Sequence, residues 1–444
     1  MGRENIRTRR RSSGATRPEP TRAPASSRAM GAYGRRTQRR LNLKERVLIV
    51  KKRQSVFNAW QTALLTALLG CVLVAWSVAD VRDASFAANA DPQDPRTVFA
   101  AEDDRAFVAT FVGDIMLGRD TSFVAGQLGY DALFQKTSLL WTDADYVFGN
   151  LECTLLDDES AYDEADKEEH FWSSDEAASA LANAGFTILQ AANNHTVDYG
   201  PEGLLHTLEA LEKSGIDVVG AGKDLAAAQK PVEDSYGPLV VKTFAASDIV
   251  PARSDAGKRS AGILSFDTGD VYQAIADARD GADLIVVGAH WGFDYARDFS
   301  ADQQSMAHSL IDAGADIVVG THAHTLEPIE LYNGGIIFYG LGNFVSDDAW
   351  IRARDSVVVR YTVDGGGASS FEISPMRIVS GIPQPTDDAI SIERDWAVLT
   401  RALDEADYRI ESGTLTIPFK TIDVSEDPFV GDLQENEEGT TGNG

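Results

Sequence analysis

Short apolar runs alternate with amphipathic stretches from residue 106 to residue 323, and this alternation constrains the fold more than any other feature of the chain. The runs are rich in β-branched residues, whereas the stretches between them carry apolar residues at helical spacing and end at glycine. Strands that alternate with helices in this order predict an α/β fold with buried strands. The expected strands are residues 106–113, 145–150, 186–193, 283–290 and 316–323, and the expected helices are residues 175–185, 201–215 and 301–314.

Two hairpins are expected to add antiparallel strands. Asn333-Gly334 separates two strand-like runs within residues 328–340, and Asn-Gly is a strong signal for a two-residue hairpin turn. A glycine-rich turn divides residues 352–379, and residues 393–406 have the pattern of a further helix. The sheet is therefore expected to be mixed.

The N-terminal part has the charge pattern of a membrane anchor. The first 53 residues hold 17 of the chain's 40 Lys and Arg residues, but only three of its 68 Asp and Glu residues. Ser55–Ala79 contain no charged residue and are long enough to cross a hydrocarbon core of about 30 Å as a helix. The positive-inside rule then leaves the tail in the cytoplasm and the remainder outside the cell membrane. A signal peptide cleaved near Ala90 is the alternative, although the apolar span is longer than such peptides usually have.

Five segments are therefore expected along the chain. Cys71 lies in the predicted span and Cys153 beyond it, so an intact anchored chain cannot join them in a disulfide, and stability must come from a core. Arginines beside a membrane span already explain the basic tail, so no nucleic-acid partner is expected. The segments are a disordered basic tail (1–54), a transmembrane helix (55–79), a linker (80–104), a folded domain (105–427) and a disordered acidic tail (428–444).

Polar side chains follow each of the five apolar runs. In open α/β sheets, ligands bind outside the carboxyl ends of the strands, so these groups can converge on one site. A single strand-end Asp or Asn is as often a helix cap or a turn former, and the inference rests on four of the seven histidines falling at strand ends. Residues two apart on an extended segment point the same way, so both histidines of the last run are expected to face this site. The groups are Asp114; Asn150 and Glu152; Asn193, Asn194 and His195; His290; and His322 and His324.

The chemistry of these side chains favours transition metals. Imidazole, carboxylate and amide ligands together suit Zn, Mn or Fe, whereas Ca and Mg prefer oxygen ligands. The set is too large for one tetrahedral ion but fits two ions about 3.5 to 4 Å apart, with Glu152 or Asp114 as the bridging carboxylate. Such a pair can clamp a phosphoryl oxygen. The remaining histidines, His170, His206 and His308, are expected to be structural or exposed.

Six motifs occur in order between residues 106 and 346: FVGDIMLGR, FGNLECTL, AANNHTVDYG, AHWGFDY, GTHAHTLEPIE and FYGLGNF. Together they resemble the poly-γ-glutamate capsule biosynthesis (CapA-like) family, a branch of the calcineurin-like metallophosphoesterases. The resemblance implies a four-layer α/β/β/α sandwich with mixed sheets and a dinuclear metal site at the strand ends.

The resemblance also implies roles for individual residues. His195 corresponds to the histidine that acts as an acid or stabilises the transition state, and Asp198 is the partner that orients it. Arg119 is the candidate for gripping an anionic group of the substrate, with a surface salt bridge as the alternative. Met116 replaces the histidine of the usual D-x-H motif, so one metal position is expected to be weaker, differently built or empty. The implied metal ligands are Asp114, Asn150, Glu152, Asn194, His290, His322 and His324.

Two functions follow from the resemblance. The first is an anchored, extracytoplasmic metal-dependent hydrolase of a phosphate ester or another bond in an anionic cell-surface polymer, acting in capsule, poly-γ-glutamate or other envelope polymer biosynthesis. The alternative is a non-catalytic accessory or scaffold subunit of a membrane synthase or export complex. Because the exported part is strongly acidic, a polyanion could bind it only at a local positive site.

Overall fold

A computed structural model describes residues 105–424 apart from residues 238 and 268–270. The predicted basic tail, transmembrane helix and linker, residues 1–104, lie outside the described residues, as does the acidic tail 428–444. Within the described part, no helix combines the length and apolar character needed to cross a membrane. This part corresponds to the predicted folded domain, residues 105–427, up to residue 424.

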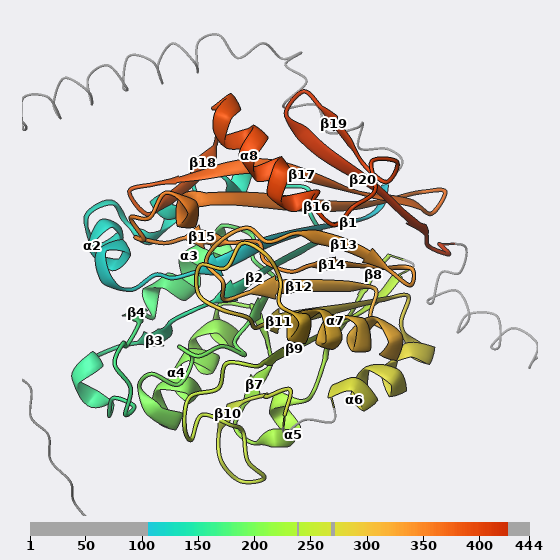
Figure 1. The fold of residues 1–444 in the computed structure, drawn as a ribbon. Coiled ribbons are helices and arrows are strands. Elements are labelled where there is room, and N and C mark those ends of the chain that lie inside the picture. The colour runs from blue at the N-terminus through green and yellow to red at the C-terminus, as the bar shows by residue number, and fades with distance from the viewer. Residues whose placement is uncertain (1–104, 238, 268–270, 425–444) are drawn as a thin grey trace, which may run out of the picture. The chain divides into compact units, whose positions relative to one another are not determined.

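Ten of the described strands form the larger of two mixed β-sheets (Figure 1). Its parallel part consists of β1 (Arg105–Ile115), β2 (Tyr146–Leu151), β5 (Ile188–Gln190), β6 (Asp217–Val219) and β15 (Asn343–Val345). Its antiparallel part consists of β16 (Asp355–Asp364), β17 (Ala368–Val379), β18 (Ile382–Pro385), β19 (Arg409–Glu411) and β20 (Thr414–Thr421). The spatial order is β19-β20-β17-β16-β1-β2-β5-β6, with β15 beside β1 and β18 beside β17. The hairpin predicted within residues 352–379 is formed by β16 and β17.

Six described strands form the second sheet. Their spatial order is β13 (Ile329–Tyr332), β14 (Gly335–Phe338), β12 (Ile317–Thr321), β11 (Leu284–His290), β9 (Leu239–Ser247) and β8 (Val232–Tyr236). The four inner strands are parallel and the two edge strands are antiparallel to their neighbours. The predicted Asn333-Gly334 turn joins β13 to β14, and both residues have positive φ, 47° and 82°, as a two-residue hairpin turn of this type requires.

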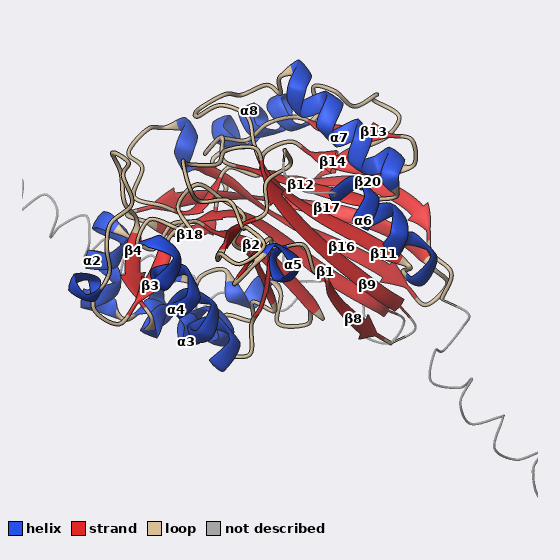
Figure 2. Ribbon diagram, turned by 90° about the horizontal axis from the view of Figure 1, so that it is seen from below, coloured by secondary structure: helices blue, strands red, loops and turns tan. Residues whose placement is uncertain are grey.

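Both faces of each sheet are covered, which explains why the central strands are apolar without alternation. Phe111 on β1 and Val286 on β11 belong to one core between the sheets, whereas their neighbours Val112 and Ile285 pack under helices on the outer faces. The layers therefore follow in the order helix, sheet, sheet, helix, and the predicted α/β fold with mixed sheets is confirmed (Figure 2). The outer helices are α2 (Arg119–Leu128), α3 (Glu176–Asn183) and α4 (Gly200–Lys213) on the first sheet, and α6 (Val271–Ala278) and α7 (Ala301–Ala313) on the second.

The last helix, α8 (Ala389–Leu399), adds Trp396 to the core between the sheets. It begins before the predicted range 393–406 because Asp388 caps it by accepting a hydrogen bond from the backbone of Ser391, and it ends at Leu399. Smaller elements complete the domain: the pairs β3 (Thr154–Leu156) with β4 (Trp172–Ser174) and β7 (Ala221–Gly222) with β10 (Gly262–Ile263), the short α5 (Leu225–Ala228), and 3₁₀ turns at Tyr130–Leu133, Ser138–Leu140, Glu159–Ala161, Arg279–Gly281 and Arg352–Arg354.

Candidate metal centre

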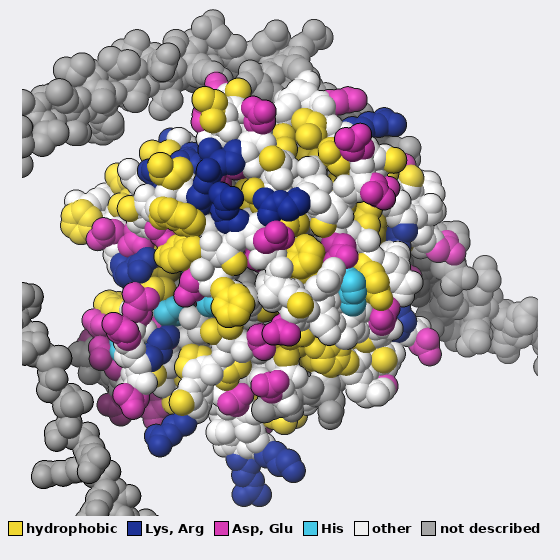
Figure 3. Space-filling model, in the orientation of Figure 1, with side chains coloured by type: hydrophobic (Ala, Val, Ile, Leu, Met, Phe, Trp, Pro, Cys, Tyr) yellow, Lys and Arg dark blue, Asp and Glu magenta, His cyan; other side chains and the backbone are white. Residues whose placement is uncertain are grey.

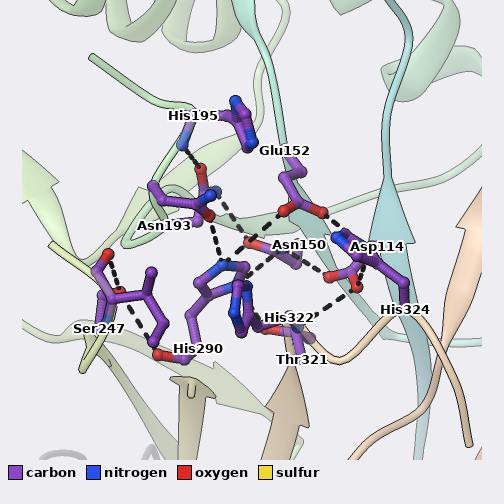
Figure 4. A network of polar contacts seen from close by, with 12 residues as sticks. Asp114, Asn150, Glu152, Asn193, His195, Ser247, His290, Thr321, His322 and His324 are labelled. Carbon is purple, nitrogen blue, oxygen red and sulfur yellow. Dashed lines mark hydrogen bonds and ion pairs between the residues drawn. The ribbon is translucent and has the colours of Figure 1, made fainter. Parts of the chain in front are cut away.

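The carboxyl ends of β1, β2, β5, β11 and β12 meet at one place, where the two sheets face each other (Figure 4). Within the first sheet, Asp114 lies in register with Asn150, whose Nδ2 donates to Asp114 Oδ1 over 2.7 Å. Between the sheets, His290 Nε2 lies 2.7 Å from Asn194 Oδ1. Polar residues placed after separate strands are therefore brought together by the packing of one sheet on the other.

Glu152 is the centre of this group. Its side chain is fully buried, and neither carboxylate oxygen has a hydrogen-bond partner among the described residues. Its Oε1 lies 3.8 Å from His290 Nε2, and its Oε2 lies 3.7 Å from His324 Nδ1. Burial and the neighbouring Asp114 raise the pKa of Glu152 well above its usual value, because an ionised carboxylate in such a place needs a compensating positive charge. These features fit a cation-binding residue.

Two of the three histidines, His290 and His322, have the protonation state that a metal ligand needs. Burial lowers the pKa of His290 well below its ordinary value and that of His322 to about 4, so both rings are neutral and offer a lone pair. His322 Nδ1 is buried without a hydrogen-bond partner among the described residues. His324 differs: burial opposes its protonation, but Glu152 and Asp114 raise its pKa to about 10. The His324 proton thus supplies the positive charge that a metal ion would supply in its place.

The donors form two groups that share Glu152, as Figure 4 shows for the residues it labels. Oε1 of Glu152 faces His290, whose ring also contacts Asn194. Oε2 of Glu152 faces His324, whose Nδ1 also lies 3.4 Å from Asp114 Oδ2. His322 joins them, because ligand atoms of Glu152, His322 and His324 all lie within 4.8 Å of one another. Asn150 contacts this set through Asp114, because its Nδ2 donates a hydrogen bond to the Asp114 carboxylate. Its Oδ1 accepts a hydrogen bond from Asn193 Nδ2 over 2.9 Å. A set of imidazole and carboxylate donors around one shared carboxylate fits two divalent ions.

The backbone of the H-x-H segment differs from the expectation. His322 has a φ of 92° and His324 a φ of 57°, so the segment is not extended, and the argument that residues two apart point the same way does not apply. Two left-handed residues instead turn the loop so that both rings face Glu152. Non-glycine residues in this region cost about 1 to 3 kcal/mol each and persist where the surroundings enforce them. Here the backbone N–H of His322 donates to Asp114 Oδ2 over 3.3 Å.

His195 lies beside the ligand group in a rigid setting. Its Nδ1 is 2.8 Å from Asp198 Oδ2, and its ring stacks on Phe171 with centroids 3.8 Å apart. Asp198 also accepts from the backbone N–H of Phe171 and from Lys167 Nζ. Burial lowers the pKa of His195, so its ring is neutral. Because the Asp198 carboxylate accepts a hydrogen bond from Nδ1–H, Nε2 carries the free lone pair.

Arg119 and Met116 lie apart from the ligand group. Arg119 forms a 2.5 Å ion pair with Asp347 and places its guanidinium 4.6 Å from the centre of the Phe171 ring, with 43% of its side chain exposed. Of the two predictions for Arg119, a salt bridge is therefore what the structure shows, at the rim of the site. Met116 is buried in the apolar cluster between the first sheet and its helices, so it brings no donor in place of the missing histidine.

Two residues at the site were missed from the sequence. Lys167, the one cation in the acidic segment 157–169, is not among the residues predicted for the site, yet it bonds Asp198 and the backbone carbonyl of Asn194. Asn343 places its Oδ1 3.0 Å from His324 Nδ1. It begins β15, next to β1, and follows the apolar run of β14 closely, so the rule that located the other polar residues could have found it.

Comparison with known proteins places this geometry in a family. The family model described as "Bacterial capsule synthesis protein PGA_cap" matches residues 108–348. The PGA biosynthesis protein CapA of Bacillus subtilis (strain 168) is 38% identical over 315 residues, which cover 70% of this chain and 82% of that protein. The capsule biosynthesis protein CapA of Bacillus anthracis is 34% identical over 369 residues, which cover 82% of this chain and 87% of that protein. A probable polyglutamine synthesis accessory protein of Mycobacterium tuberculosis (strain ATCC 25618 / H37Rv) is 34% identical over 211 residues, which cover 43% of this chain and 55% of that protein.

Among solved structures, the calcineurin-like phosphoesterase YfkN of Bacillus subtilis aligns with a TM-score of 0.37 and 12% identity, covering 64% of this chain and 89% of that one. A similarity at this level supports no conclusion about the site. The family model is decisive, because the residues it matches include every implied ligand from Asp114 to His324. The two CapA proteins support it, since each is more than 30% identical and is covered over more than two thirds of its length. The chain belongs to the bacterial capsule synthesis family PGA_cap.

Proposed function

We propose that this protein is a metal-dependent hydrolase of an anionic envelope polymer, anchored in the cell membrane and acting outside it in poly-γ-glutamate capsule biosynthesis. The observation that carries the proposal is Glu152, a fully buried carboxylate that has no hydrogen-bond partner in the part of the chain that the structure describes and whose two oxygens face His290 and His324. The relatives named for PGA and capsule biosynthesis support the biological role. The uncharged segment Ser55–Ala79 supports the membrane anchor.

Two divalent ions of Mn, Zn or Fe fit the donors. Asn194 and His290 would hold one ion together with Glu152, and His322 would join them, since its ring centroid lies 4.8 Å from that of His290. Asp114 and His324 would hold the other ion together with the same carboxylate. Such ions, when bound, polarise the scissile group and lower the pKa of water, which is the chemistry that hydrolysis of a stable ester or amide requires.

The remaining site residues manage protons and charge. Asp198 and the Phe171 ring fix His195, so its Nε2 lone pair can accept a proton and then pass that proton to a leaving group without reorganisation of the site. Lys167 holds Asp198 in place by a 2.5 Å ion pair. Arg119 remains partly exposed at the rim and offers guanidinium N–H groups to an anionic group of the substrate.

A direct test uses the purified full chain, its metal content and its hydrolysis of bis(p-nitrophenyl) phosphate and of γ-glutamyl oligomers. We expect about two transition ions per chain and hydrolysis of at least one of these substrates. The His322→Ala variant is expected to lose both metal and activity. His206→Ala removes a histidine of α4 that bonds Asp175 away from the site, and it is expected to keep both. Wild-type protein with neither metal nor activity contradicts the proposal.

Two observations support the alternative function, an accessory subunit without catalytic activity. One relative is named as an accessory protein, and Met116 leaves the Asp114 side of the centre one ligand short. On this view the metal stabilises the fold of a subunit that assembles with a membrane synthase complex. Polymer production in cells distinguishes the two functions: a hydrolase requires His195, whereas a scaffold works equally well with His195→Ala.

A further inference from the structure

Basic side chains gather on one face of the described domain (Figure 3, dark blue), and the contacts around Asp355 identify a group of five arginines. Three of them, Arg297, Arg352 and Arg394, line one small pocket. The other two lie close by, since Arg354 belongs to the same 3₁₀ turn as Arg352 and Arg377 pairs with Asp355, the partner of Arg394. This gathering is notable because only 23 Lys and Arg residues follow residue 53, against 65 Asp and Glu residues.

The cluster of these five arginines carries more positive charge than its surroundings neutralise. The Asp355 carboxylate pairs with three of the guanidinium groups. It accepts a hydrogen bond from Arg394 Nε over 2.9 Å and forms ion pairs with Arg352 and Arg377. Asp395, whose pKa burial raises to about 7, lies 3.6 Å from Arg394 Nε, and the Asp388 carboxylate also acts on Arg377 and Arg394. With these three carboxylates ionised, the five arginines still leave an excess of two positive charges.

Two members of the arginine cluster have free guanidinium groups. Neither Arg297 nor Arg354 forms an ion pair or a side-chain hydrogen bond with any residue the structure describes, and Arg354 Nε is buried without a partner. A buried N–H of a charged group is costly to leave unbonded. Arg354 also lines a neighbouring cavity of about 540 Å³, whose other charged lining residues are Asp120, Asp347 and Asp348. The cluster therefore adjoins a hollow in which Arg354 is the one cation among the lining residues.

The arginine cluster is directly linked to the metal centre. Ala353, the middle residue of the turn that carries Arg352 and Arg354, accepts a hydrogen bond from Asn343 Nδ2 over 3.1 Å. The other end of the same side chain, Asn343 Oδ1, lies 3.0 Å from His324 Nδ1. One asparagine side chain thus separates the arginines from a metal ligand.

We propose that the arginine cluster is a binding site for the carboxylates of a γ-glutamyl chain and that it holds this chain beside the metal centre. The identity of the polymer rests on the proposed function; the anion site itself rests on the arginines. A guanidinium matches a carboxylate with two parallel hydrogen bonds, and a chain with repeated carboxylates can occupy several arginines at once. A local positive site of this kind is what a polyanion needs to bind a strongly acidic domain.

The test measures the affinity of the full chain for a fluorescent γ-glutamyl oligomer in the presence of a metal chelator. The variant Arg297→Gln/Arg354→Gln removes the two arginines without ion-pair partners, so no described ion pair is lost with them. We expect its dissociation constant to rise at least tenfold, and that of the single variant Arg354→Gln to rise by a smaller factor. The matched control Lys258→Gln/Arg259→Gln removes the same charge from an exposed loop and is expected to stay within twofold of wild type.

Three results would overturn the inference: unchanged affinity in Arg297→Gln/Arg354→Gln, an equal loss in the control, or tighter binding of a polyphosphate chain of the same charge. The last would assign the cluster to phosphate rather than carboxylate groups. His322→Ala separates this inference from the proposed function. It is expected to lose metal while binding the oligomer like wild type, so a failure of hydrolysis leaves the anion site intact.

Discussion

Oε2 of Glu152 lies 3.7 Å from Nδ1 of His324, and the two residues belong to different sheets. Glu152 follows β2 of the first sheet, and His324 follows β12 of the second. Glu152 has no hydrogen-bond partner among the described residues, and of the positive charges that act on it the largest effect comes from His324. The contact therefore joins the two halves of the sandwich at the metal centre.

Metal binding is expected to stabilise the fold through this contact. An ion present at 100 times its dissociation constant adds about 2.7 kcal/mol to the free energy of unfolding. Glu152→Gln keeps the shape of the side chain but removes the shared negative charge, so we expect it to lose most of this gain. Urea unfolding with and without Mn²⁺ measures the effect. An equal gain in wild type and variant would show that Glu152 does not bind the ion.

The two metal positions are expected to differ in affinity. The position at Asp114 and His324 lacks the ligand that a histidine at Met116 would provide, whereas the other has Asn194, His290 and His322 nearby. Titration with a chelator should remove the ions in two steps. His324→Ala should abolish the weaker step and leave the tighter one, and a single step in wild type would contradict this assignment.

His195 is expected to act in catalysis and not in metal binding. General acid–base catalysis contributes roughly 10² to 10⁴-fold in rate, so His195→Ala should lower kcat by a factor in this range. Its metal content should equal that of wild type, since the Nδ1 of the ring is held by Asp198. A parallel loss of metal and activity would instead identify His195 as a ligand.

Stability should fall as pH rises because of Glu327. Its side chain is fully buried, and burial raises its pKa to about 8, against an ordinary value of 4.5, although a hydrogen bond from Gln303 opposes the shift. Between these two values the folded chain binds more protons than the unfolded chain, so the stabilisation present at low pH is lost as pH rises through this window.

Glu327→Gln removes this titration while keeping the acceptor for Gln303. At ~1.4 kcal/mol per pKa unit, the variant should be more stable than wild type at pH 8 by on the order of a few kcal/mol. Unfolding in urea at pH 5, 7 and 9 measures the slope. The exposed control Glu212→Gln is expected to keep the wild-type slope, and a wild-type slope in Glu327→Gln would refute the assignment.

The ligands could be predicted from the sequence because they follow strands. A buried parallel strand is apolar on both faces, so a charged or imidazole side chain at its end marks the carboxyl end of the sheet, as Asp114 and His290 do at the ends of β1 and β11. Local rules of this kind also located the Asn333-Gly334 hairpin and the helix from Ala301, whose Ser300 forms a capping box with Gln303.

Features that depend on contacts distant in the sequence could not be predicted in this way. Lys167 lies in a charged segment whose composition predicts exposure, and only the fold places it on Asp198. The left-handed backbone of His322 and His324 is imposed by the packing of their loop. The arginine cluster brings together residues from 297 to 394, no two of which belong to a recognisable motif.

The most direct measurement is an anomalous difference map from crystals of the full chain grown with Mn²⁺. The account predicts two peaks, one on each side of the Glu152 carboxylate, the first contacted by Asn194, His290 and His322 and the second by Asp114 and His324. A map without a peak at Glu152, from crystals in which these side chains are ordered, would contradict it.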